Sequence, residues 1–199
     1  ARVPSPLESM DAQIRIDSIE VMSRGEQITR LNGKVGCTNG ILSFSPLKGQ
    51  SSVGSKTTVE MTWDTTPQPT KATLSWKTKD IDYGLIIKKL GIRDDIVGKL
   101  DLKLNVEGQG LTLREILSST NGEMEILFGK GHTPRHALEL WGDELLRLLI
   151  PTNWIKADIT DLNCAVGRFD IRNGVIKSNV LLMDTRRITV VGEIGVDLK

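Results

Sequence analysis

Two histidines, His132 and His136, are the residues of this sequence whose type and spacing come closest to a chemical site. Side chains four positions apart share one face of a helix, and imidazoles in this arrangement can bind a transition metal. Glu139 is the nearest candidate for a third ligand. His132, however, precedes Thr133, a suitable N-cap for a helix that begins at Pro134, and is therefore expected outside that helix. The pattern favours an exposed pair of histidines, and we predict no metal site.

The other candidates for catalytic or phosphate chemistry are weaker. Residues 129–133 read Gly-Lys-Gly-His-Thr, but the GxxxxGK[ST] spacing of a phosphate-binding loop is absent. The chain has no Gly-x-Ser-x-Gly nucleophile elbow. Acidic pairs such as Asp94-Asp95 lie beside turn residues, where carboxylates commonly act as caps. The sequence therefore predicts a protein that is not an enzyme and holds no cofactor.

The two cysteines, Cys37 and Cys164, allow at most one disulfide. They are far apart in the sequence, and no Cys-x-x-Cys or Cys/His spacing accompanies them. Because an unpaired cysteine packs like a small hydrophobic residue, two buried thiols are favoured over a bridge.

The composition excludes some classes of protein. A hydrophobic fraction of 39% and a charged fraction of 26% are those of a soluble globular protein. With 26 Lys and Arg against 25 Asp and Glu, the chain lacks the basic excess of a nucleic-acid-binding protein. No apolar run approaches the roughly 20 residues that cross a bilayer, and the first residues lack the apolar core of a signal peptide. We expect any export signal or membrane anchor to lie outside this sequence.

Alternating apolar and polar residues predict β-strands along most of the chain. Segments 58–63, 72–76 and 100–106 alternate without a break. Asn39-Gly40 and Asn173-Gly174 separate apolar-rich runs, and Asn-Gly favours the two-residue type I′ turn of a hairpin because both residues tolerate a positive φ. We expect about eight antiparallel strands, each with one apolar and one polar face.

Three segments have helical spacing instead. Residues 83–91 carry a short apolar stripe that ends at a glycine, and Thr112 with Glu115 has the spacing of a capping box. The longest predicted helix begins at Pro134, continues to about Ile150 and has Thr133 as its N-cap. We expect about three short helices packed against one face of the sheet.

This amount of one-sided sheet leaves a broad apolar surface, since only about three short helices are available to cover it. A soluble monomer seldom exposes an apolar patch beyond a few hundred Å². Two sheets could face each other as a closed sandwich, which the residues alone favour slightly. A curled sheet would instead leave a groove for acyl chains, where each buried CH₂ contributes about 0.8 kcal/mol.

The chain also contains a faint internal repeat. Residues 35–42 are similar to residues 169–176, with the hairpin glycine in the same place. Repeated β-meander units build an architecture that grows by stacking. We expect an N-terminal β-meander unit over 1–97 with a short helix, and a C-terminal unit over 98–199 with a helical insert at 134–150, joined in one continuous sheet.

The order of these motifs resembles the AsmA family of Gram-negative envelope proteins. Residues 98–110 form an alternating strand that ends in a glycine turn, and residues 113–126 read as a short helix and a strand entered through Asn-Gly-Glu. After the helical insert, residues 164–176 and 190–198 are similar to the closing strands of the family. The fold class implied is mainly β (α+β): a curled antiparallel sheet of meander repeats that forms a taco-like groove.

The N-terminal half resembles the same family through residues 42–54 and 81–84. Family members generally begin with a membrane anchor, which this sequence lacks. The resemblance therefore implies the C-terminal part of a periplasmic protein that is tethered to the inner membrane through an anchor outside this chain.

The resemblance also implies a function: binding phospholipid or another acyl-chain lipid and transferring it toward the outer membrane, in support of outer-membrane assembly. Outer-membrane assembly proteins are further candidate partners, and nucleic acid is not one. The alternative is a structural or chaperone-like assembly factor that offers its sheet to precursors of outer-membrane proteins.

On the lipid hypothesis, the apolar faces of the strands form the wall of the groove. The candidate wall residues are Val59, Met61, Trp63, Leu74, Trp76, Leu100, Leu102, Leu104, Val106, Ile188 and Val190. The helix at 134–150 would gate one end through Leu138, Trp141, Leu145 and Leu148. Which face of each strand points inward depends on the register, because a slip of one residue reverses it.

Overall fold

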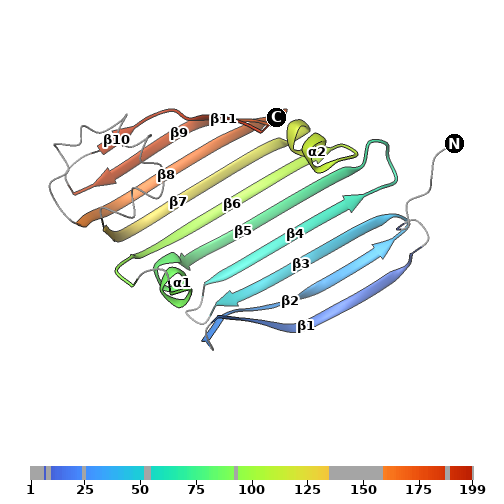
Figure 1. Cartoon of the computed structure of the whole chain (residues 1–199), viewed down its shortest axis with the longest axis horizontal. Coiled ribbons are helices and arrows are strands. Elements are labelled where there is room, and N and C mark those ends of the chain that lie inside the picture. Colours follow the sequence, from blue (N-terminus) through green and yellow to red (C-terminus); the bar gives the residue numbers. More distant parts are fainter. Residues whose placement is uncertain are drawn as a thin grey trace.

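The computed structural model is dominated by a single antiparallel β-sheet (Figure 1). The residues that the structure describes are 7, 10–23, 26–51, 55–91, 94–134, 159–186 and 189–198. The strands are β1 (Ala12–Ser23), β2 (Glu26–Thr38), β3 (Ile41–Ser51), β4 (Lys56–Asp64), β5 (Lys71–Asp82), β6 (Val97–Gln109), β7 (Asn121–Pro134), β8 (Ile159–Arg172), β9 (Val175–Thr185), β10 (Thr189–Val191) and β11 (Gly195–Asp197). The mainly-β prediction is confirmed, and the described part of the chain has more strands than the eight or so that we expected.

The strands follow one another in the sheet in the order in which they occur in the sequence. Each of the first nine is hydrogen-bonded to the next, and β11 pairs with β9 beside β10. Short turns make this meander feasible. Asn39 and Gly40 have φ angles of 49° and 81°, and Asn173 and Gly174 have φ angles of 49° and 73°. Both predicted Asn-Gly hairpins are confirmed, because these positive φ values are those that a type I′ turn requires.

The sheet is not closed into a barrel. Within the described ranges, β1 is hydrogen-bonded only to β2, and β10 and β11 are hydrogen-bonded only to β9. All the described strands belong to this one sheet. The two facing sheets of a sandwich, which the residues alone favoured slightly, are therefore not the arrangement that these strands adopt.

In the described part of the chain, two helices are inserted in the connections of the sheet. The first, α1 (Tyr83–Lys89), follows β5, and its N-cap Asp82 accepts a hydrogen bond from the backbone N–H of Leu85 at 2.8 Å. The second, α2 (Leu113–Ser119), joins β6 to β7. In Figure 1 the two helices lie at opposite ends of the strands. Both were predicted from their apolar spacing and caps.

The third predicted helix is wrong at its start. Thr133 and Pro134 belong to β7, where they pair with Thr160 and Ile159 of β8. Backbone pairing with β8 continues to the end of the strand and outweighs the local Thr-Pro capping signal. Proline is tolerated there because a terminal strand position needs no further backbone donor. The rest of this segment, 135–150, lies outside the described residues.

The buried core of the described residues is small. Four apolar side chains are buried: Cys37, Ile96, Ile116 and Ile171. Both cysteines have free thiols, with Cys37 on β2 and Cys164 on β8. Most other apolar side chains of the sheet are only half-buried, so the fold presents a broad apolar surface that it does not bury completely.

Candidate functional site: the apolar face of the sheet

The register of the strands brings the apolar side chains of the sheet onto one face. Directly paired residues of antiparallel strands lie on the same face. Val59 of β4 pairs with Trp76 of β5, Trp76 pairs with Leu104 of β6, and Leu104 pairs with Met124 of β7. Met124 in turn pairs with Phe169 of β8. This row crosses five strands without a polar residue.

Two parallel rows extend the same face, which we call the apolar face. In one, Phe44, Met61, Leu74 and Val106 are paired in succession, and this row continues through Gly122 to Ile171 and Ile176. The other runs from Leu100 through Phe128, Ala165 and Met183 to Val190. Together the rows reach from β3 to β10.

The candidate wall residues that the structure describes all lie on this face. They are Val59, Met61 and Trp63 of β4, Leu74 and Trp76 of β5, Leu100, Leu102, Leu104 and Val106 of β6, and Val190 of β10. Ile188 and the four gating positions, Leu138, Trp141, Leu145 and Leu148, lie outside the described residues.

Several apolar residues of this face were not among the candidates. They are Val35, Phe44, Leu47, Met124, Ile126, Phe128, Phe169, Ile171, Leu181 and Met183. Their alternation in 124–128 and 169–171 is a signal that could have identified some of them. The sequence alone could not show which face of the sheet these residues lie on, because β8 and β9 contain register shifts that reverse the alternation.

The side chains of the apolar face are accessible. Those of Val59, Met61, Leu74, Leu102 and Leu104 are half-buried. Trp76 is 37% exposed, and its indole N–H donates to the Thr57 hydroxyl at 3.0 Å. Such a face offers dispersion contacts and desolvation to an aliphatic ligand, with few polar groups that would need a partner.

The two helices pack over opposite ends of this face. At one end, the ring of Tyr83 in α1 meets Phe128 edge-on, with the centroids 5.7 Å apart. A Cβ at Gly98 would lie 2.1 Å from the Tyr83 hydroxyl, so glycine makes room for this ring. At the other end, Ile116 of α2 is buried, and a Cβ at Gly108 would lie 2.6 Å from its carbonyl oxygen. The two helices therefore cover the ends of β6, and the middle of β6 is flanked by the neighbouring strands.

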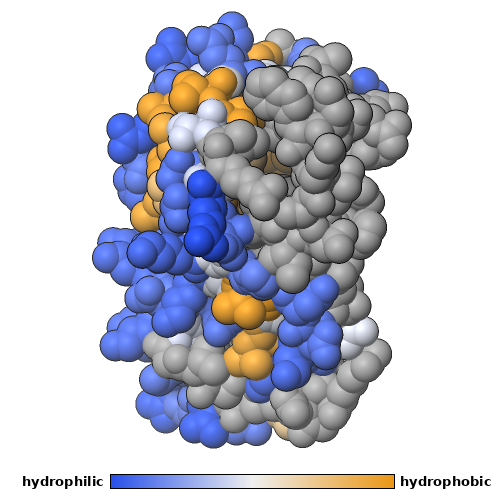
Figure 2. Space-filling view, turned by 90° about the vertical axis from the view of Figure 1, so that its left-hand side faces the viewer, coloured by the Kyte–Doolittle hydropathy of each residue, from blue (hydrophilic) through white to orange (hydrophobic). Residues whose placement is uncertain are grey.

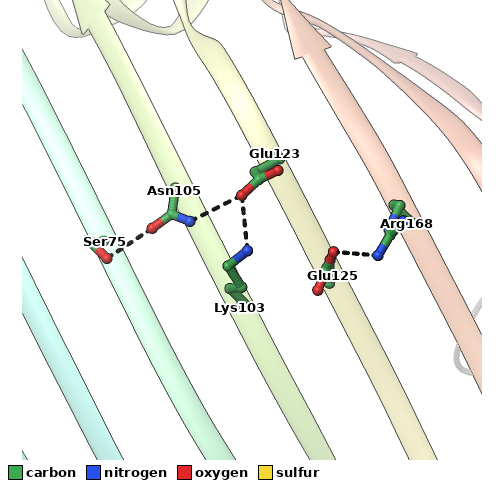
Figure 3. A network of polar contacts seen from close by, with 6 residues as sticks. All are labelled: Ser75, Lys103, Asn105, Glu123, Glu125 and Arg168. Carbon is green, nitrogen blue, oxygen red and sulfur yellow. Dashed lines mark hydrogen bonds and ion pairs between the residues drawn. The ribbon is translucent and has the colours of Figure 1, made fainter.

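The opposite face of the sheet is polar (Figure 3). Asn105 lies between Ser75 and Glu123, with hydrogen bonds of 2.8 and 3.2 Å. Lys103 donates to Glu123 at 3.0 Å, and this ion pair raises the pKa of Lys103 and lowers the pKa of Glu123. Arg168 donates to Glu125 at 2.7 Å. These cross-strand bonds satisfy the side chains of these six polar residues, which alternate with the apolar wall.

Figure 2 shows the molecule from the left-hand side of Figure 1. Hydrophilic residues cover most of the left part of that view, and hydrophobic residues form separate patches at its upper left and in its lower middle.

His132, the described member of the histidine pair, forms a polar cluster with Asp161 and Arg186. His132 of β7 lies with its Nδ1 2.8 Å from Asp161 of β8, and Arg186 approaches the other oxygen of the same carboxylate at 3.7 Å. His136 and Glu139 lie outside the described residues. Across the described ranges, no group of three or more His, Cys, Asp and Glu side chains could hold a metal ion.

Comparisons with known proteins agree on one family. The model of the AsmA family matches residues 5–181. The chain is also similar to the AsmA family protein YhjG of Escherichia coli (strain K12), with 20% identity over 183 residues. That alignment covers 91% of this chain and 26% of the relative, so the chain spans about a quarter of the length of this curated protein. No solved structure matches the chain. No helix among the described residues is long and apolar enough to cross a bilayer.

Proposed function

Because the chain belongs to the AsmA family, we propose that it is a non-catalytic module that binds acyl-chain lipid along its apolar face and passes it along the sheet. Family membership points to a role in the assembly of the bacterial envelope. The finer proposal is a periplasmic segment, tethered to the inner membrane through another part of a longer protein, that supports phospholipid transport to the outer membrane.

The observation that carries this proposal is the continuity of the apolar rows. Trp76, Leu104 and Met124 contribute to one row that crosses the middle of the sheet, and their side chains are not enclosed by a second sheet in the described part of the chain. A smooth aliphatic surface binds acyl chains without specific contacts, because each buried CH₂ contributes about 0.8 kcal/mol. Acyl chains held only by such nonspecific contacts would be free to move along the sheet.

The curvature that would turn this face into a taco-like groove is part of the proposal. Long antiparallel sheets twist and coil, and bulges increase the local twist. The register shifts in β1, β3, β5 and β7 are of this kind. A groove rather than a flat sheet would shield the acyl chains from water on their way.

A charge placed on the apolar face tests this function. Leu104→Glu would put a carboxylate in the middle of the row that crosses β4 to β8, and we expect binding of a fluorescent acyl probe to fall by about tenfold or more, since burying an unpaired charge is costly. Lys103→Gln is the matched control, because Lys103 is adjacent on β6 but faces the polar side. The control should bind the probe like the wild type.

The circular dichroism spectrum and the urea midpoint of Leu104→Glu separate two outcomes. A folded variant that no longer binds the probe supports the proposal. A folded variant that binds the probe normally contradicts it, and an unfolded variant shows that the face is a closed core, which also contradicts it.

The open edges of the sheet favour a second candidate function, that of a structural or chaperone-like assembly factor. β1 and the β10–β11 edge are each paired on one side only within the described residues, and such edges accept an added strand. Crosslinking to an unfolded outer-membrane barrel protein at these edges, without lipid on the apolar face, would favour this function over lipid transfer.

A further inference from the structure

The polar face is interrupted by a row of aliphatic side chains near one edge of the sheet. Leu127 of β7 pairs with Val166 of β8, Val166 pairs with Leu182 of β9, and Leu182 pairs with Val191 of β10. Leu127 is 43% exposed and Val191 is 73% exposed, and Val180 in the neighbouring row is 45% exposed. These aliphatic side chains are therefore exposed on the polar face, where they cannot contribute to the apolar face on the other side of the sheet.

A group of lysines lies on the same polar face, in the rows that lead to these aliphatic residues. Lys56 and Lys79 are directly paired across β4 and β5, and Lys77 and Lys103 are directly paired across β5 and β6. Like charges in directly opposite positions destabilise a sheet. The Lys103 ammonium group is bonded to a glutamate, whereas no described residue forms an ion pair or hydrogen bond with the ammonium group of Lys56, Lys77 or Lys79. These three ammonium groups are therefore available to an anion from outside the chain.

A shallow depression of about 350 Å³ connects the two features. Lys77 and Lys79 line one side of it, and Leu127, Val166 and Val180 line the other. Four successive strands each contribute three consecutive residues to its lining, and β9 contributes Val180 alone; the outer two residues of each triplet lie on the polar face, so the depression opens on that face.

The charge balance of the depression is positive. Its cationic residues are Lys77, Lys79, Lys103 and Arg168, and its anionic residues are Asp101 and Glu125. Arg168 is bonded to Glu125 at 2.7 Å, and Asp101 accepts the backbone N–H of Asp80 at 2.7 Å. Both carboxylates therefore already have partners, whereas the ammonium groups of Lys77 and Lys79 remain available.

We propose that this depression and its rim form a docking site for the surface of a lipid bilayer that carries anionic headgroups. Lysines near such a surface are attracted to its negative potential, and exposed aliphatic side chains enter the boundary between headgroups and acyl chains. A soluble anion would engage the lysines but leave the aliphatic row exposed, so a surface with both chemistries fits better. The site is separate from the apolar face and does not require that face to carry lipid.

The test is co-sedimentation of the chain with vesicles of phosphatidylcholine, with and without phosphatidylglycerol. We expect binding only to the anionic vesicles, weakened as salt is raised. Lys77→Glu/Lys79→Glu should lower the apparent affinity by about tenfold or more, and Leu127→Ser/Val180→Ser should also lower it.

Lys71→Glu/Lys177→Glu is the matched control, since it makes the same change in net charge at the far end of the same face. Lys71 pairs with Gln109, and Lys177 pairs with Asp170. These positions lie outside the depression, and screening limits their effect to about twofold. Circular dichroism of every variant shows whether it is folded.

The outcomes distinguish this site from the proposed lipid-transfer surface. Lys77→Glu/Lys79→Glu should keep the binding of the acyl probe, and Leu104→Glu should keep the binding of anionic vesicles. Equal binding to neutral vesicles, or normal vesicle binding by folded Lys77→Glu/Lys79→Glu, would overturn the proposal. Sedimentation velocity tests whether the surface instead binds a second copy of the chain. The proposal would be overturned if the wild type is a dimer and Lys77→Glu/Lys79→Glu dissociates it while vesicle binding stays unchanged.

Discussion

Leu104 lies directly opposite Trp76 on the apolar face, while Lys103 beside it on β6 lies opposite Lys77 on the polar face. One step along β6 thus separates a continuous apolar surface from a charged one. The alternation of side chains along the strands thus gives the sheet two surfaces with different chemistry.

Tryptophan emission should report lipid on the apolar face. Trp63 and Trp76 lie there, with the Trp76 indole bonded to Thr57. Phospholipid with brominated acyl chains should quench their emission, because bromine must come close to the ring. Trp63→Phe/Trp76→Phe should reduce the quenching, and unbrominated lipid is the control. Emission that brominated lipid leaves unchanged, despite bound lipid, would place the lipid elsewhere.

Removing the buried side chain of α2 should destabilise the end of the sheet that this helix covers. Ile116 is 7% exposed and lies against Gly108. Ile116→Ala should lower the free energy of unfolding by about 2–4 kcal/mol, through lost burial and the cavity left behind. The neighbouring Leu117 is exposed, so Leu117→Ala should cost about 1 kcal/mol or less. Urea denaturation measures both, and equal losses would show that α2 is not anchored by Ile116.

A glycine in β7 should tolerate no side chain. Gly122 has a φ of 151°, and a Cβ there would lie 2.0 Å from the backbone oxygen of Asn105. Gly122→Ala should therefore destabilise the chain by about 2 kcal/mol or more, since the clash is with backbone and the conformation is unfavourable for alanine. Gly129 on the same strand has its nearest atom at 3.7 Å. Gly129→Ala is the control and should leave the urea midpoint nearly unchanged.

Stability should fall in acid partly through Asp184. The Thr189 hydroxyl and the Asn163 amide donate to its carboxylate and hold the pKa of Asp184 below its ordinary value. Folding therefore favours the ionised form, and this contribution is present above the ordinary carboxyl pKa of about 4 and is lost as the pH falls through the lower, folded value.

Asp184→Asn should consequently lose less stability than the wild type between pH 7 and pH 3, as measured by urea unfolding. Thr189→Val removes the main donor and should reduce the acid sensitivity in the same direction. If both variants show the wild-type difference between the two pH values, Asp184 does not contribute to the acid response.

The alternation of the sequence was sufficient to predict most of the strands, because each of β1 to β9 pairs with the strand that follows it in the chain. The Asn-Gly turns and the caps of α1 and α2 are equally local signals, and they were interpreted correctly. The start of the third helix was wrong because Thr133 and Pro134 pair with β8, and a partner at Ile159 and Thr160 leaves no local signature. Local capping rules cannot anticipate a strand that returns after a long insertion.

The faces of the strands were harder to predict than the strands themselves. Leu100 to Val106 alternate throughout, so their common face follows from sequence. In β5, however, the register shifts between Thr78 and Ile81, and Asp80 has a positive φ of 54°. Nothing in the residue types marks this shift. The aliphatic row at Leu127 and Val166 was missed for a related reason, since apolar residues occur on both faces of 126–128.

Labelling with a phospholipid that carries a photoactivatable group in its acyl chain tests the central claim most directly. After irradiation and proteolysis, mass spectrometry locates the labelled residues. We predict labels on Trp76, Leu104, Met124 and their neighbours on the apolar face, and none on Lys103 or Glu123. Labels confined to the polar face, or no label on the folded chain, would contradict lipid binding along the sheet.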